Sequence, residues 1–289
     1  MAAEDWSQAI HDYLTAHKGR RARRTLAEQE RHLRAFSHWF GQPLASVLPV
    51  HLEEYLASHS QRVKLVTAWG YVLRLKRFFA WAAKTERILW NPAEKMKSPH
   101  FERPSRRLLG VAQVQQLLQH HPWGSRDATI LEVFYGTGLR LEEVFRLDVS
   151  DVDLARQHLS VGCSKGGAPR LAPFGPHLQS VLTHYLENER PPSSDAALWL
   201  NYKGQRLSKV HLGTILRRTA QALGLGVVSP HHLRHAYATH LLEGGAPLRM
   251  VQVLLGHRTG QATQIYTHLV PAELFKEHRR THPRARRRA

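Results

Sequence analysis

The chain has 289 residues, which is enough for two domains of modest size. Hydrophobic residues make up 42% of it and seven residues are tryptophan, a composition that supplies enough apolar surface for packed cores and excludes global disorder. Lysine and arginine number 41 against 23 acidic residues, which gives a formal net charge of +18 with histidine neutral. A field of that sign attracts polyanions. Nucleic acid is the expected partner, and an anionic membrane surface or a merely basic soluble protein are the alternatives.

The first residues and the cysteine content bear on the compartment of the protein. Residues 1–6 carry two acids where a signal peptide has lysines, and no uninterrupted apolar run approaches the roughly 18 residues of a membrane span. The single cysteine, Cys163, excludes an internal disulfide and any multi-cysteine zinc site. These features predict a cytoplasmic protein without a membrane partner.

Residues 1–98 have the pattern of a helical domain. Apolar residues recur at helical spacing over residues 26–40 and again over residues 66–83, and Gly41-Gln42-Pro43 stops the first of these stretches. Basic side chains cluster in the same region, so that phosphate contact is favoured over a solvated face. These basic residues are Arg74, Arg77 and Lys84 on one helix face, with the run 18–24.

Residues 99–108 contain two prolines and little apolar surface, which is a linker composition. A helical pattern restarts after it, so we expect a second domain over residues 109–289. That domain has one region of strand pattern, with a turn at Gly166–Pro169 between its last two strands. The predicted fold class is mainly α with α+β character, a helical first domain and a mostly helical second domain with a small antiparallel sheet. The predicted strands are 149–153, 158–161 and 170–174.

The segment Ser229–His235 predicts a helix that begins with a cluster of cationic side chains. Ser229 is a favourable N-cap and Pro230 a favourable first residue, which places His231 and Arg234 on one face of the helix. Hydrogen-bond donors at a helix N-terminus form a natural site for a phosphate group. Helical phase with Arg234 favours His231 over its neighbour His232 as the residue that faces the site.

A metal pair is the alternative interpretation of this helix. His231 and His235 are four residues apart, which is a spacing at which two histidines can share a metal ion. A zinc hydrolase needs a third ligand and a carboxylate base, and here Arg234 would place a positive charge beside the metal. The phosphate interpretation is therefore preferred.

Three other segments carry candidate functional residues. Gly136-Thr137-Gly138-Leu139-Arg140 interrupts a helical pattern and starts another, Lys165 lies in the predicted turn, and Leu254-Leu255-Gly256-His257 precedes Tyr266 by nine residues. Each segment alone has an ordinary structural interpretation: a helix corner, a surface lysine, a core or surface aromatic. Their order along the chain, with His231 and Arg234 between them, makes a chance combination implausible.

This ordered set of residues strongly resembles the catalytic signature of tyrosine recombinases and integrases. The stretch 229–269 and the ending His282-Pro283-Arg284-Ala285 look closest to the Xer branch. The resemblance covers the second domain, and the helical first domain fits the core-binding domain of that family less specifically. It implies a two-domain clamp around duplex DNA.

By this resemblance, Tyr266 attacks the scissile phosphate and forms a 3′-phosphotyrosyl link. Arg140 and Arg234 hold the non-bridging oxygens of the phosphate, as fixed guanidinium forks can. Lys165 protonates the leaving 5′-oxygen, and His231 accepts the proton of Tyr266, whose ordinary pKa is about 10.

Two further residues have implied roles. His257 donates a hydrogen bond to the phosphate, and Glu143 matches an acidic position of the family that orients its catalytic neighbours. No metal, ATP or other cofactor is expected, because arginines supply the positive charge and the covalent link conserves the energy of the broken bond.

The implied partners are a duplex recombination site and other recombinase protomers. The resemblance implies a homo- or hetero-tetramer on DNA, with the segment after Tyr266 docking on a neighbour through Leu269, Leu274 and Phe275; packing within their own chain is the alternative. The Xer resemblance implies resolution of chromosome or plasmid dimers, or integration of a mobile element, and it includes a DNA translocase among the implied partners. A type IB topoisomerase and a non-catalytic DNA-binding protein are the alternative functions, and the intact set of six residues argues against the second.

Overall fold

The computed structural model of the chain divides into two compact units, Met1–Ser105 and Arg106–Ala289. The division falls inside the segment 99–108, where the composition predicted a linker. Each unit has its own hydrophobic core of buried residues. The structure describes residues 2–19, 23–100, 108–162, 169–256 and 271–285.

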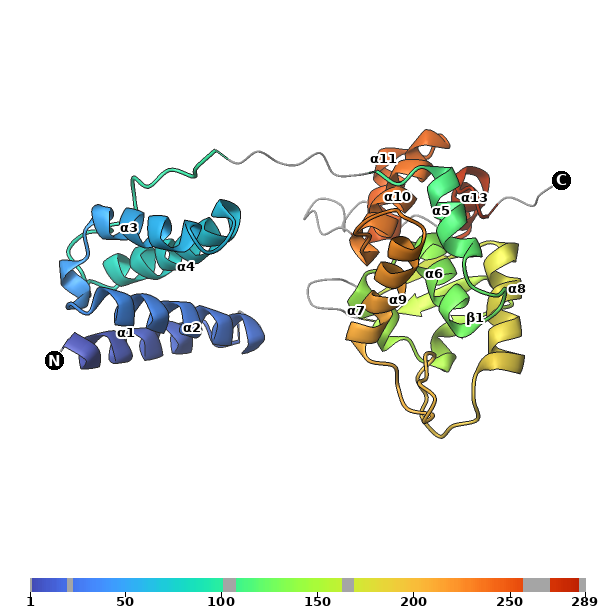
Figure 1. The fold of residues 1–289 in the computed structure, drawn as a ribbon, viewed down its shortest axis with the longest axis horizontal. Helices are drawn as coiled ribbons and strands as arrows, with labels where there is room; N and C mark the ends of the chain where they lie inside the picture. Colours follow the sequence, from blue (N-terminus) through green and yellow to red (C-terminus); the bar gives the residue numbers. More distant parts are fainter. Residues whose placement is uncertain (1, 20–22, 101–107, 163–168, 257–270, 286–289) are drawn as a thin grey trace. The chain divides into compact units, whose positions relative to one another are not determined.

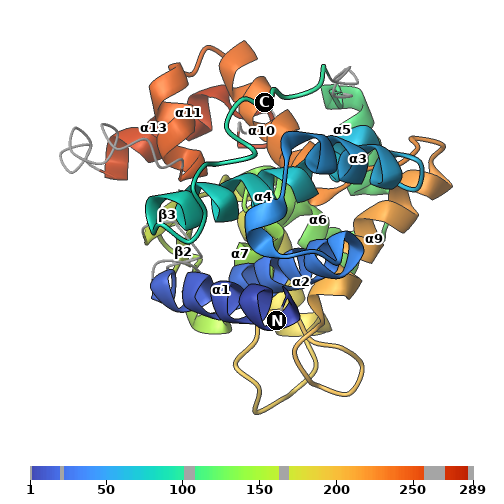
Figure 2. The same cartoon turned by 90° about the vertical axis from the view of Figure 1, so that its left-hand side faces the viewer.

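The first unit is a set of four helices around an aromatic core. The rings of Trp6 and Phe36 lie 5.7 Å apart, and Trp6 also stacks on Phe78 at 5.8 Å. The predicted stop at Gly41 is present, where the glycine adopts a φ of +67° directly after a helix. Helices α1 and α2 form one layer and α3 and α4 the other (Figures 1 and 2), and α4 contacts both α1 and α2. The elements are α1 (Ala2–Ala16), α2 (Arg23–Phe40), a 3-10 turn η1 (Leu44–Ser46), α3 (Pro49–Ser60) and α4 (Leu65–Lys84).

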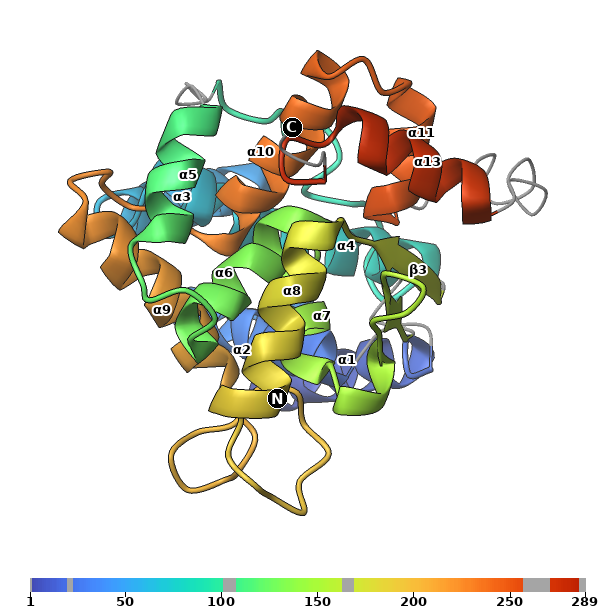
Figure 3. The same cartoon turned by 90° about the vertical axis from the view of Figure 1, so that its right-hand side faces the viewer.

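The second unit is built around helix α6, whose residues 128–137 are all buried. Helix α6 contacts α5, α7, α8, α9 and α10, and Figure 3 shows α8 lying across it. This central helix therefore sets the positions of the helices on which the candidate residues lie. The helices are α5 (Val111–Gln119), α6 (Arg126–Thr137), α7 (Leu141–Arg146), α8 (Pro176–His184), the π-helical turn η3 (Tyr185–Glu189), α9 (Lys209–Ala222), α10 (Pro230–Glu243), α11 (Leu248–Leu255) and α13 (Pro271–Thr281).

The sheet of the second unit has three antiparallel strands in the order β1-β2-β3, namely β1 (Val152–Asp153), β2 (His158–Val161) and β3 (Arg170–Pro173). The register pairs Val161 with Arg170. The prediction of a first strand from residue 149 was wrong, because Val149–Asp151 is a 3-10 turn, η2. The backbone N–H of Asp148 donates to the carboxylate of Asp151 at 2.9 Å, which closes this turn before the strand begins.

The mainly helical architecture with one small antiparallel sheet confirms the predicted fold class. Among the described helices, none has both the length and the apolar character needed to cross a bilayer.

Helix α13 packs against its own chain. The buried His278 forms a 3.1 Å hydrogen bond through its Nε2 with the carbonyl oxygen of Gly136. Leu274 packs against the core of the second unit, and the ring of Phe275 lies 5.8 Å from that of His158. For Leu274 and Phe275 the structure therefore corresponds to the intrachain alternative. Leu269 lies outside the described residues.

Candidate active site

The corner between α6 and α7 positions Arg140. Helix α6 ends at Thr137, and Gly138 then adopts a φ of +63°. A Cβ added at Gly138 would lie 2.4 Å from Cδ1 of Tyr237, so glycine is required here both for its backbone conformation and for the ring beside it. The chain can therefore turn sharply against α10, and Arg140 follows as the residue that precedes α7.

Glu143 is the buried centre of the site. Its carboxylate accepts from the backbone N–H of Arg140 at 2.8 Å and from Nη1 of the same residue at 2.9 Å. It also accepts two parallel bonds from Arg170, at 3.0 Å and 2.9 Å. Burial by itself raises the pKa of Glu143, but the hydrogen bonds and charge of Arg170, with the hydrogen bonds of Arg140, outweigh burial and lower the pKa to about 2. The carboxylate is therefore ionised at neutral pH and anchors both arginines.

Arg234 is buried beside these groups. Its Nη1 donates to the carbonyl oxygen of Gly138 at 2.7 Å, and its Nη2 donates to that of Leu255 at 2.6 Å. Burial, followed by the charge of Arg140, lowers the pKa of Arg234 to about 10. The guanidinium therefore stays charged at neutral pH and ties the corner after α6 to the end of α11.

Three arginines from three different elements meet at the C-terminal end of α11. Successive carbonyl oxygens there accept from Arg170 Nε at 3.2 Å, from Arg234 Nη2 at 2.6 Å and from Arg140 Nη2 at 3.5 Å. The last carbonyls of a helix have no partner within the helix and carry its partial negative charge, so cations are favoured at this position. The three accepting residues are Leu254, Leu255 and Gly256.

The set of Arg140, Arg170, Arg234 and Glu143 is called the arginine cluster below. In it, Arg140 and Arg170 donate to the carboxylate of Glu143, and Arg234 interacts with that carboxylate through its charge. The side chain of Arg140 is 34% exposed, whereas that of Arg170 is 11% exposed. An excess of fixed positive charge with one solvent-accessible fork is suited to holding a phosphate group.

The start of α10 separates the two adjacent histidines. The backbone N–H of Ser229 donates to Nδ1 of His232 at 3.0 Å, so His232 takes part in capping the helix. His231 is exposed, while Leu233 and Tyr237 are buried. Within the described part of the chain, no three histidine, cysteine, aspartate or glutamate residues are grouped so that they could hold a metal ion.

Three of the six predicted catalytic residues, Lys165, His257 and Tyr266, lie outside the described residues. The structure brings Arg140 and Arg234 together around the end of α11. His257 follows Gly256 directly in the chain, and Lys165 precedes the β3 strand that begins with Arg170.

Sequence reasoning did not single out Arg170. Its only local signal is a basic side chain at the first residue of a strand, and many surface strands carry such a residue. Its partners lie 27 and 84 residues away along the chain, at Glu143 and Leu254. Only the tertiary structure identifies it as part of the site.

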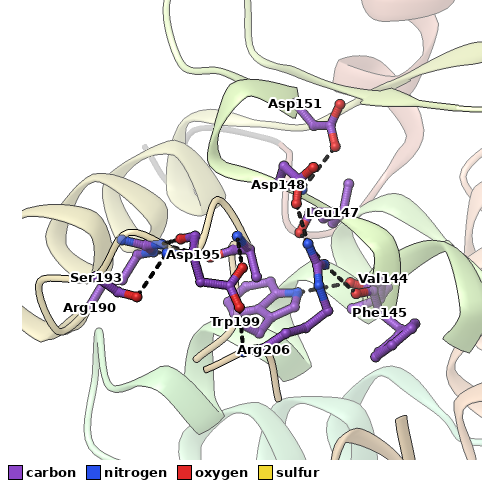
Figure 4. Close-up of polar contacts among 11 residues, drawn as sticks. Val144, Phe145, Leu147, Asp148, Asp151, Arg190, Ser193, Asp195, Trp199 and Arg206 are labelled. Atoms are coloured by element: carbon purple, nitrogen blue, oxygen red, sulfur yellow. Dashed lines mark hydrogen bonds and ion pairs between the residues drawn. The ribbon is translucent and has the colours of Figure 1, made fainter. Parts of the chain in front are cut away.

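A second polar network lies at the other end of α7, and Figure 4 shows it. Arg206 donates through Nη1 to the carbonyl oxygens of Phe145 at 2.9 Å and of Leu147 at 3.2 Å, and it pairs with Asp148. The backbone N–H of Arg206 donates to Asp195 at 2.9 Å. This network ties the chain before α9 to the end of α7.

Arg190 extends the same network. Its Nη2 donates to the carbonyl oxygens of Asp195 and Ala197, both at 2.8 Å. The residues Arg190, Arg206, Asp148 and Asp195 are called the Arg206 network below.

Comparison with known proteins assigns the family. The model of the phage integrase family matches residues 107–273, which is more than half of the chain. The chain is 36% identical over 298 residues to the tyrosine recombinase XerC of Mycobacterium sp. (strain KMS), with 96% of this chain and 98% of the relative covered. It is 39% identical over 217 residues to the XerC recombinase of Corynebacterium efficiens, covering 73% and 70% of the two chains.

Solved structures share the fold. An integrase of the Tn1549 transposon in complex with transposon right-end DNA matches with a TM-score of 0.76 at 19% identity, covering 94% of this chain and 98% of that chain. A lambda integrase tetramer bound to a Holliday junction matches with a TM-score of 0.71 at 21% identity, covering 88% and 77%.

The chain belongs to the phage integrase family. Its activity class is site-specific tyrosine recombination, a DNA strand-transfer reaction, and its similarity to the two XerC recombinases extends along most of its length. The topoisomerase alternative finds no support among the relatives named above.

Proposed function

We propose that this chain cuts and rejoins duplex DNA at a specific site through a 3′-phosphotyrosyl bond to Tyr266. The observation that carries the proposal is the arginine cluster, because its excess positive charge and its exposed fork at Arg140 suit a phosphate whose charge grows on the non-bridging oxygens during transfer. Family membership supplies the reaction class.

The predicted residues account for each bond and each proton that changes in the cleavage step. The phenol oxygen of Tyr266 forms a bond to phosphorus and gives its proton to His231. The bond from phosphorus to the 5′-oxygen breaks, and that oxygen takes a proton from Lys165. The products are a 3′-phosphotyrosine and a free 5′-hydroxyl, and rejoining is the reverse reaction with a new 5′-hydroxyl.

The remaining residues hold the phosphate. Arg140 and Arg234 bind its non-bridging oxygens, and His257 donates a further hydrogen bond. Glu143 orients Arg140. The reaction in this proposal needs no metal ion and no ATP, because guanidinium groups provide the positive charge and the phosphotyrosyl bond conserves the energy of the phosphodiester.

The wider proposal follows the XerC relatives and the DNA-bound integrases. Residues 1–98 form a DNA-binding domain, 99–108 a linker, and 109–289 the catalytic domain of a clamp. Four protomers, of one or two kinds of recombinase, act on paired sites in the cytoplasm, and Leu269 contacts a neighbouring protomer, while Leu274 and Phe275 pack within their own chain. The use is resolution of chromosome or plasmid dimers at cell division, or integration of a mobile element, with a DNA translocase as activator.

A covalent-adduct assay tests the proposal. Nicked suicide duplexes carrying the candidate resolution site of the host are incubated with wild-type protein and with Tyr266→Phe, and the products are run on a denaturing gel. We expect an adduct with wild type and none with Tyr266→Phe. Binding without an adduct, even after addition of a paired recombinase, would contradict the proposal. Relaxation of plasmids without sequence preference would instead favour the topoisomerase alternative.

A further inference from the structure

Arg170 is placed so that each nitrogen of its guanidinium has a partner inside the protein. Nη1 and Nη2 donate to the two carboxylate oxygens of Glu143, and Nε donates to the carbonyl oxygen of Leu254. Because all three nitrogens donate within the protein, and two of them donate to one buried carboxylate, Arg170 is held by its protein neighbours. It acts on its protein neighbours.

The neighbours of Arg170 are the supports of the phosphate-binding residues. Glu143 holds both the backbone N–H and the guanidinium of Arg140. Leu254 begins the set of three carbonyls whose next two members accept from Arg234 and Arg140. Arg170 therefore links strand β3 to the two arginines that are proposed to bind the phosphate, Arg140 and Arg234.

Close packing at the end of α11 reinforces this link. Gly256 adopts a φ of +63°, and a Cβ added there would lie 3.1 Å from Cδ, Cζ and Nε of Arg170. The side chain of Arg170 therefore lies in close contact with the backbone of Gly256, the residue that directly precedes His257. A displacement of Arg170 would be transmitted to this turn.

The electrostatic balance of the site also depends on Arg170. Without it, the buried carboxylate of Glu143 would keep Arg140 as its cationic hydrogen-bond partner. A buried carboxylate that loses two of the three guanidinium hydrogen bonds described above interacts more strongly with the one that remains. Arg140 would then be held toward Glu143, and its contact with an incoming phosphate would be weaker.

We propose that Arg170 is a positioning residue for DNA cleavage: it fixes Glu143 and the end of α11, so that Arg140 and Arg234 meet the phosphate in the reactive geometry. This inference rests on the proposed function. It predicts that loss of Arg170 slows the chemical step while DNA affinity stays close to that of wild type.

The test compares single-turnover rates of adduct formation on the nicked suicide duplex for wild type, Arg170→Met, Arg170→Lys, Glu143→Gln and the double variant Arg170→Met/Glu143→Gln. Affinity for the same duplex is measured separately, with each substitution placed in the Tyr266→Phe background. We expect Arg170→Met to form the adduct about 100-fold more slowly, the scale of a misplaced catalytic group. Arg170→Lys, which keeps the charge but not the fork, should be intermediate.

The double variant separates positioning from a general loss of packing. If Arg170 acts through Glu143, removing the carboxylate as well should slow the reaction no further than Arg170→Met alone, because coupled residues are not additive. Arg170→Lys and the double variant also keep the inference testable if Arg170→Met fails to fold.

Arg206→Met is the matched control. Arg206 also combines a carboxylate with carbonyls at the end of a helix, but it lies in the Arg206 network. Its rate of adduct formation should stay close to that of wild type.

Three results would overturn the inference: a wild-type rate in Arg170→Met, a rate loss matched by an equal loss of DNA affinity, or losses that multiply in the double variant. Failure of the proposed function looks different, because the wild-type protein itself would then form no adduct.

Discussion

The arginine cluster and the Arg206 network lie at opposite ends of α7 and use the same bonding pattern. In each, guanidinium nitrogens donate to a carboxylate and to the carbonyl oxygens at the end of a helix, namely α11 for the cluster and α7 for the network. Such carbonyls have no partner within their helix, so arginine is a favourable capping residue for both. The shared pattern alone does not distinguish a functional site from a structural one.

The difference between them is charge balance. The Arg206 network has two arginines and two aspartates, and its guanidinium groups are used to hold the chain before α9 against α7. The arginine cluster has three arginines and a single carboxylate, which lies fully buried among them. Uncompensated positive charge costs stability, and a bound phosphate would restore the balance. Charge excess is therefore the feature on which the proposal of a phosphate site at the cluster rests.

The largest expected difference between the two regions is in catalysis. Arg140→Ala should slow adduct formation by about 10³- to 10⁵-fold, the range known for an arginine that stabilises a phosphoryl-transfer transition state. Arg206→Ala removes an arginine with a similar bonding pattern and should leave the rate near that of wild type. Single-turnover assays on the nicked duplex measure both. Equal losses in the two variants would mean that charge excess does not identify the site.

The next expected difference is in stability. Glu143→Gln leaves buried guanidinium groups without their counter-charge and should lower the free energy of unfolding by about 3–5 kcal/mol. Asp148→Asn breaks a pair whose side chains are 29% and 37% exposed, and it should cost about 1 kcal/mol or less. Urea denaturation of both variants gives the comparison. A smaller loss for Glu143→Gln than for Asp148→Asn would contradict the assignment of Glu143 as the buried anchor.

The pH dependence of unfolding distinguishes the arginine cluster from the two buried histidines at the C-terminal end of α13, His278 and His282. Burial lowers the pKa of His278 from 6.5 to about 4, so between these values the unfolded chain binds a proton that the folded chain does not. The free energy of unfolding should therefore fall as the pH drops from 6.5 to 4, by about 3 kcal/mol for this group. Glu143, with a pKa lowered from 4.5 to about 2, stays ionised in the folded chain over this range, so its own loss of the same sign begins only near pH 4.5, where the unfolded carboxyl takes up a proton.

A His278→Gln variant sharpens this prediction. Burial also holds the pKa of His282 well below its ordinary value, so His282 contributes a loss of the same sign and some slope should remain. Urea denaturation at several pH values from 7.5 to 4 measures the slopes, and equal slopes in wild type and variant would show that His278 is not the titrating group.

The smallest expected difference concerns two glycines in the same backbone conformation. Gly138, whose carbonyl accepts from Arg234, and Gly224 have φ values of +63° and +66°. Alanine at Gly224 should cost about 1 kcal/mol from backbone strain, because nothing lies within 4 Å of the added Cβ. Alanine at Gly138 also meets the ring of Tyr237 and should cost a further 1–3 kcal/mol. Thermal or urea unfolding of the two variants tests this order, and equal costs would contradict it.

Local features of the sequence predicted those parts of the molecule that depend on neighbours in the chain. The corner at Gly138 and the start of α10 at Pro230 follow from backbone preferences of glycine and proline, and both are confirmed. The first strand was predicted too long, because a side chain of Asp151 that bonds to the backbone of Asp148 competes with strand pairing. Periodicity cannot report such a bond.

The family, the order of the six candidate residues and the excess of positive charge follow from residue types and their spacing. Which charges meet depends on the tertiary structure. Arg170 and Glu143 are 27 residues apart, and the end of α11 is brought to them from another part of the chain by packing around α6. A guanidinium selects its partners by distance and direction in space. The separation of two residues along the chain does not show whether they are partners.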